Sequence, residues 1–139
     1  MSEPHELRIR VRYHEADSMG VVHHAVYFVY LEEGRTELMR SLGIPYEDVE
    51  RGGVAMGVRK IDVRYRGPAR YGDVVRVLTW IRRIGGASIQ FEYELRRAGD
   101  DELLLTGTVE TVSVEMGTLK PVPTPDEIRE AVTAGAPRR

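Results

Sequence analysis

The chain has 139 residues, a net charge of −2 and no cysteine. This length is typical of one domain with its own hydrophobic core, so we expect a single domain over residues 1–139. The near-zero charge argues against a nucleic-acid partner, and the lack of cysteine excludes disulfides and thiolate nucleophiles. No apolar run has the length of a membrane span and none resembles a signal peptide, so we expect a cytoplasmic protein without membrane insertion.

The first elements are predicted from the spacing of apolar residues. Apolar and arginine residues alternate over 7–13, which predicts a half-buried strand. An acidic turn over 15–20 follows, and then helical spacing predicts a long helix from about 23 to 43, with one short helical turn at 45–50. Gly34 lies in the middle of the long helix, where close approach to a sheet would explain a residue of low helix propensity.

Four further strands are predicted over 58–66, 74–83, 87–96 and 103–115. The second of them is apolar on both faces, which favours an interior place in the sheet. Thr124, Pro125 and Glu127 predict a capped helix over about 125–133, and we expect the last five residues to fray. The simplest packing is an α+β domain, in which the long helix lies across a five-stranded antiparallel sheet with its core at about 7–125.

Asp17 is the first candidate for chemistry, because it lies a few residues before the start of the long helix. The first amides of a helix are unpaired and carry partial positive charge, so they could polarise a carbonyl beside this carboxylate. On spacing alone, a turn or cap residue is the simpler interpretation of Asp17. His23 and His24 lie at the same helix start without the spacing of metal ligands, so we expect neither a metal nor a cofactor.

The charged residues of the helix and strands have simple explanations. Arg35 lies on the apolar stripe, so we expect it to form an ion pair with a neighbouring strand or subunit. Pairs of basic residues end strands at 59–60, 82–83 and 96–97. Solubility and protection of sheet edges explain these pairs more simply than binding of a ligand's phosphates does.

The segment from Tyr13 to Arg35 resembles the first motif of the hotdog-fold acyl-CoA thioesterases of the 4-hydroxybenzoyl-CoA and Tol-Pal-associated types. The matching residues are Tyr13, Glu15, Asp17, Gly20, Val21, Val22, His24, Tyr27, Tyr30, Glu33 and Arg35. The segment 65–73, which includes Pro68, resembles the second block of the family. The chain departs from the family's pattern at His23, where an aromatic residue is usual, at Val26, which is often Asn, and at Gly34, which is often Ala.

The resemblance implies a hotdog fold, in which the sheet wraps the long helix, and homodimers or homotetramers with active sites between subunits. It implies that Asp17 is the catalytic carboxylate and that the backbone N–H near His24 polarises the thioester carbonyl. It places seven further residues in substrate binding or pocket support: Gly20, Val21, Val22, His23, Tyr27, Glu33 and Pro68. One carboxylate suffices chemically, because a thiol with a pKa near ~8.5 can leave as thiolate without a strong general acid.

The sequence therefore predicts an acyl-CoA thioesterase for a small to medium acyl or aroyl group, with Asp17 as base or nucleophile and no cofactor. Two alternatives remain, a hotdog hydratase or dehydratase and a non-catalytic acyl-CoA-binding module. The Asp17 block fits the first less well, because hydratases need an acid–base pair placed for C–O chemistry. The identity of the acyl group and the choice between coenzyme A and acyl carrier protein as donor stay open.

Overall fold

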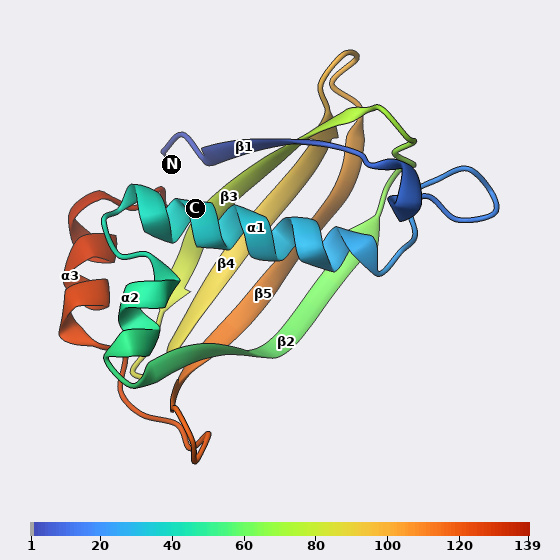
Figure 1. Cartoon of the computed structure of the whole chain (residues 1–139). Helices are drawn as coiled ribbons and strands as arrows, with labels where there is room; N and C mark the ends of the chain where they lie inside the picture. The colour runs from blue at the N-terminus through green and yellow to red at the C-terminus, as the bar shows by residue number, and fades with distance from the viewer. Residues whose placement is uncertain (1) are drawn as a thin grey trace.

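The computed structural model describes residues 2–139. Its strands are β1 (His5–Arg10), β2 (Val54–Tyr65), β3 (Val74–Ile84), β4 (Ser88–Arg97) and β5 (Leu103–Glu115). Its helices are α1 (Val26–Ser41), α2 (Tyr46–Arg51) and α3 (Asp126–Gly135), and Tyr13–Glu15 forms a 3-10 turn. Figure 1 shows α1 lying across the concave face of a strongly curved sheet, with α2 and α3 together at one end of that helix.

The five strands form one sheet in the order β1-β3-β4-β5-β2, and all four pairs are antiparallel. The α+β prediction is confirmed, and β3 has the interior place expected of it. Gly85 and Gly86 form the turn between β3 and β4, where the Gly85 N–H donates to the Ser88 carbonyl at 2.7 Å. The sheet therefore has two edges, β1 and β2, and β2 runs for 12 residues along the second.

The core lies between α1 and the sheet. Leu31 and Leu38 of α1 are fully buried and belong to one apolar cluster with residues of β3 and β4 such as Val77 and Phe91. A Cβ atom at Gly34 would lie 2.7 Å from the Val77 Cγ1 and 2.8 Å from the Thr79 Oγ1. The predicted close approach is confirmed, because only glycine lets α1 pack this near to β3.

The N-terminal elements are shorter than predicted. β1 ends at Arg10, because the backbone of Val11 bonds to the loop before β3 instead of to β3. The Val11 N–H donates to the Asp73 carbonyl at 2.8 Å, and the Val11 carbonyl accepts the Gly72 N–H at 3.1 Å. α1 begins at Val26 rather than near 23 and has 16 residues. The three residues before it belong to the loop that carries Asp17.

The prediction that the last residues fray is wrong. The Ile81 N–H donates to the Pro137 carbonyl at 2.8 Å, and the Arg139 N–H donates back to the Ile81 carbonyl at 3.1 Å. The pairing of β1 with β3 ends at Thr79, so the edge of β3 beyond that point has free backbone groups that the tail satisfies. The Arg139 guanidinium also lies 4.1 Å from the centre of the Trp80 ring.

One further local prediction is wrong, and another is wrong in one of its two alternatives. Thr124 does not cap α3: Pro125 is the residue before the helix, and the buried Thr124 hydroxyl has no hydrogen-bond partner within the described part of the chain. Arg35 is buried as expected, yet no carboxylate of residues 2–139 lies within 4.0 Å of it. It lies instead beside Tyr93, where burial raises the pKa of the phenol to about 12 and the charge of Arg35 opposes that rise. An ion pair between Arg35 and a second subunit stays a prediction.

Candidate active site

The loop that carries Asp17 is closed by its own backbone. The Asp17 N–H donates to the Val21 carbonyl at 2.8 Å, and the Gly20 N–H donates to the Asp17 carbonyl at 3.0 Å. Gly20 has a φ of 79°, a left-handed conformation that glycine adopts without strain. The four residues from Asp17 to Gly20 thus form a tight turn, which holds the Asp17 side chain in one place at its start.

The Asp17 carboxylate lines an open cavity of about 400 Å³. One oxygen, Oδ1, accepts the Met19 N–H at 2.8 Å, and no residue of 2–139 forms an ion pair with the carboxylate. The residues around this cavity, which we call the Asp17 cavity, come from the turn, the start of α1 and the end of β2: Asp17, Met19, Val21, Val22, His24, Tyr27, Tyr65, Arg66, Gly67 and Pro68. A half-buried carboxylate with a free oxygen can act on a ligand held there.

The backbone before α1 supplies a free hydrogen-bond donor. The His23 N–H donates to the Glu15 carbonyl at 2.9 Å, and the Val26 N–H donates to the His23 carbonyl at 2.9 Å. The Ala25 N–H, directly before α1, donates to the His23 Nδ1 at 3.1 Å. The His24 N–H between them donates to no acceptor within residues 2–139. Among these four amides it alone is available to a carbonyl in the cavity.

Two tyrosines connect the start of α1 to the segment after β2. The Tyr65 hydroxyl donates to the His24 carbonyl at 2.8 Å, and the Tyr27 hydroxyl accepts the Ala69 N–H at 3.2 Å. The two rings meet edge to face, with centroids 5.5 Å apart. Burial raises the pKa of Tyr27, so it remains a neutral phenol. These contacts orient the His24 peptide. The sequence did not predict this role of Tyr65, because the alternation of residues along a strand does not show which groups the last residue of the strand contacts.

Glu15 stabilises the same loop through hydrogen bonds of its buried carboxylate. Its carboxylate is buried, and Oε1 accepts both the Tyr30 hydroxyl and the Arg12 N–H at 2.8 Å. Burial and this bond to Glu15 raise the pKa of Tyr30 well above its usual range. Because the Glu15 carbonyl also accepts the His23 N–H, this residue ties the loop to α1. The Tyr-x-Glu-x-Asp spacing in the sequence marked Glu15 as part of the motif, but it did not show that Tyr30 would be its hydrogen-bond partner.

The other predicted site residues divide into three groups. Val21, Val22, Tyr27 and Pro68 line the Asp17 cavity with Asp17 and His24. Gly20 and His23 are not among its lining residues: Gly20 completes the turn, and the His23 ring accepts the Ala25 N–H. Glu33 lies apart: it lines hollows on the other side of α1, next to Leu7 of β1. Within the single chain, the structure does not bring Glu33 to Asp17.

The described residues contain no cluster of three or more histidine, cysteine, aspartate or glutamate side chains suited to a metal ion. None of the helices in the part of the chain that the structure covers has the length and apolar character needed to cross a bilayer. The groups that line the Asp17 cavity include the Asp17 carboxylate, the Tyr27 and Tyr65 phenols, His24 and Arg66.

A five-stranded antiparallel sheet wrapped around one long helix is the hotdog fold. Comparison with known proteins agrees: a model of the thioesterase-like superfamily matches residues 11–132. The chain belongs to this superfamily, and it is a thioester hydrolase.

Three similar proteins illustrate the range of the family. The putative acyl-CoA thioesterase YneP of Bacillus subtilis is 38% identical over 114 residues, which cover 82% of this chain and 82% of that protein. The acyl-acyl carrier protein thioesterase ATL3 of Arabidopsis thaliana is 33% identical over 129 residues, which cover 93% of this chain and 67% of that protein. The crystal structure of the DHNA-CoA thioesterase from Staphylococcus aureus has a TM-score of 0.88 and 29% identity, and the match covers 92% of this chain and 87% of that one.

Proposed function

We propose that the protein hydrolyses the thioester of an acyl- or aroyl-coenzyme A in the Asp17 cavity, without a cofactor. The observation that carries this proposal is the pairing, in one cavity, of the half-buried Asp17 carboxylate with the unpaired His24 N–H. The donor of the acyl group is proposed from similarity, since YneP and the Staphylococcus aureus enzyme are named for coenzyme A thioesters. As an enzyme proposed to act on coenzyme A thioesters, it is also proposed to act in the cytoplasm.

The chemistry needs few groups. The His24 N–H stabilises negative charge on the carbonyl oxygen as the carbonyl carbon is attacked. Asp17 either removes a proton from the attacking water or attacks the carbon itself, forming an anhydride that water then cleaves. In both routes the C–S bond breaks, the coenzyme leaves as thiolate because its thiol pKa is near ~8.5, and the acyl group leaves as the free acid.

We also propose that two copies pair along β2 into a homodimer or, where two such dimers join, a homotetramer. β2 is an edge strand whose backbone groups on one side have no partner in the sheet. Three large apolar residues on it are exposed, Val58, Ile61 and Tyr65. Because Tyr65 also lines the Asp17 cavity, a dimer formed here would place the cavity at the subunit interface. Light scattering of the purified protein tests this, and a monomer at micromolar concentration would contradict it.

Release of thiol from a panel of acyl-CoAs tests the function. The panel runs from acetyl to palmitoyl and includes benzoyl and phenylacetyl, and a thiol reagent reports turnover without background because the chain has no cysteine. We expect turnover that depends on Asp17 and is lost in Asp17→Asn. Hydration of crotonyl-CoA without thiol release would favour a hydratase, and tight binding without any turnover would favour a binding module.

A further inference from the structure

We propose that a basic hollow on the outer face of the sheet binds the phosphate groups of the coenzyme A nucleotide. The basic hollow has a volume of about 360 Å³ and contains four cationic side chains, Lys60, Arg64, Arg66 and Arg82. Asp62 is the single carboxylate that lines it. This inference rests on the proposed function, and it assigns a place to the part of the substrate that lies farthest from the thioester.

The floor of the basic hollow consists of short side chains. Lys60 and Arg64 lie on one face of β2, opposite Glu110 and Thr106 of β5 in the antiparallel register. The middle of the hollow is lined by three residues of β5, Thr106, Gly107 and Thr108, and its far side is lined by Arg82 of β3. Long cationic side chains therefore surround a floor that cannot fill the space. Such an arrangement leaves room for an anion and supplies several donors around it.

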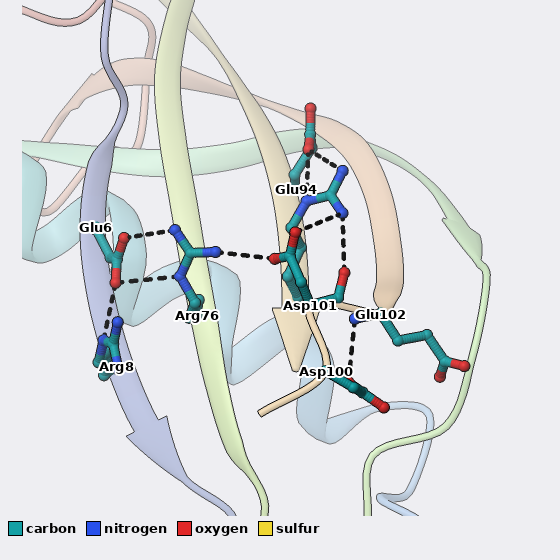
Figure 2. Close-up of polar contacts among 8 residues, drawn as sticks. Glu6, Arg8, Arg76, Glu94, Asp100, Asp101 and Glu102 are labelled. Atoms are coloured by element: carbon teal, nitrogen blue, oxygen red, sulfur yellow. Dashed lines mark hydrogen bonds and ion pairs between the residues drawn. The ribbon is translucent and has the colours of Figure 1, made fainter. Parts of the chain in front are cut away.

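Most charges of the basic hollow have no close ion pair among residues 2–139, unlike those of a second arginine group on the sheet. Figure 2 shows that second group, in which Arg76 forms ion pairs with Glu6 and Asp101 at 2.9 and 3.0 Å. Arg96, in the same group, pairs with Glu94 at 3.1 Å. These arginines already have carboxylate partners in the folded chain, so they offer less free charge to a ligand.

In the basic hollow, neither Lys60 nor Arg64 has a carboxylate within 4.0 Å among residues 2–139. Arg66 makes one long hydrogen bond, to the Thr106 Oγ1 at 3.4 Å, and Arg82 has one loose ion pair, with Glu92 at 3.6 Å. Glu110 faces Lys60 but pairs at 2.9 Å with Arg59. The hollow thus holds a net positive charge that the protein itself does not neutralise, which favours an anionic ligand.

The basic hollow and the Asp17 cavity share one lining residue, Arg66. Arg66 directly follows β2, and Lys60 lies six residues earlier, or ~20 Å at ~3.3 Å per residue along a strand. An extended pantetheine arm can bridge this distance. A thioester beside Asp17 would therefore place the diphosphate and the ribose phosphate of coenzyme A over Arg64 and Lys60.

The test compares an acyl-CoA with the pantetheine thioester of the same acyl group, which lacks the nucleotide. In the double variant Lys60→Glu/Arg64→Glu, KM for the acyl-CoA should rise about tenfold or more, while kcat for the acyl-CoA and kcat/KM for the pantetheine thioester stay unchanged. Arg82→Glu, which lies on β3 away from the proposed dimer edge, should raise the same KM severalfold. Arg51→Glu is the matched control, because Arg51 is exposed on α2 and pairs only with Asp48.

Calorimetry with coenzyme A itself separates this inference from the proposed function, because binding needs no turnover. Weaker binding of coenzyme A in the double variant and in Arg82→Glu, at unchanged oligomeric state, supports the basic hollow even if no thioester is cleaved. If all variants leave the KM of the acyl-CoA and the affinity for coenzyme A unchanged, the inference is overturned. It is also overturned if the variants impair only hydrolysis of an acyl carrier protein thioester, since the hollow would then dock an acidic protein.

Discussion

Glu15 and Asp17 are two carboxylates of one short loop, and the fold treats them in opposite ways. Glu15 is 6% exposed and accepts two hydrogen bonds on one oxygen, from Tyr30 and from the backbone of Arg12. Asp17 is half-buried, accepts one local N–H and faces an open cavity. The comparison teaches that a buried, doubly bonded carboxylate stabilises a loop, whereas the carboxylate free to react is the one with an oxygen left over.

The largest effect is expected from Asp17→Asn. The amide keeps the size of the side chain and an oxygen for the Met19 N–H, but it cannot act as a base, so kcat should fall about 10²–10⁴-fold. The melting temperature should stay within about 2 °C of the parent, since no buried contact is lost. Steady-state thiol release and a thermal melt check both halves. A variant that retains near-normal turnover would show that the reacting carboxylate lies elsewhere.

Glu15→Ala should have the reverse profile. Removal of a buried carboxylate leaves the Tyr30 hydroxyl and the Arg12 N–H without their acceptor, which should cost about 3 kcal/mol of unfolding free energy. Glu15→Gln is the matched control, because its amide oxygen can still accept both bonds and the loss should be about 1 kcal/mol. Urea unfolding measures both values. Equal losses in the two variants would contradict a role for Glu15 that depends on these hydrogen bonds.

These two residues also show what the sequence could predict. The motif around Asp17 predicted its place beside a helix start, and strand alternation predicted the sheet, because both depend on local spacing. The pairing of the tail with β3 depends on where β1 stops, and the contact of Tyr65 with His24 joins residues 41 positions apart. The expected carboxylate partner of Arg35 could not be predicted for the same reason, because no local pattern shows which side chains will surround a buried guanidinium.

Gly34→Ala should have an effect of intermediate size, on stability, because it changes the packing of α1 against β3. The added methyl group would clash with Val77 and Thr79 of β3, and overpacking of this kind costs about 1–3 kcal/mol. Gly135→Ala is the control, because a Cβ at that position of α3 meets no atom within 4 Å. We expect a lower unfolding free energy for Gly34→Ala only. Equal stability of the two variants, measured by urea unfolding, would mean that α1 shifts away from β3 without cost.

The smallest effect is expected from Tyr65→Phe, which removes the hydrogen bond to the His24 carbonyl. This partly exposed bond is worth about 0.5–1.5 kcal/mol, so kcat should fall about threefold to tenfold as the His24 peptide loses its orientation. Tyr71→Phe serves as control, since Tyr71 is exposed and its ring packs edge to face on that of Tyr13. The same thiol-release assay reports both. An equal fall of kcat in the two variants would contradict the claim that the Tyr65 hydroxyl orients the His24 peptide.

The central claim is that the Asp17 carboxylate and the His24 N–H act on one carbonyl group. The most direct measurement is a crystal structure with an acyl-CoA analogue in which a methylene group replaces the thioester sulfur, so that the carbonyl remains but cannot be cleaved. The account predicts that the carbonyl oxygen lies within about 3 Å of the His24 nitrogen, with the Asp17 carboxylate facing the carbonyl carbon. A carbonyl bound away from the His24 N–H, with Asp17 directed elsewhere, would contradict it.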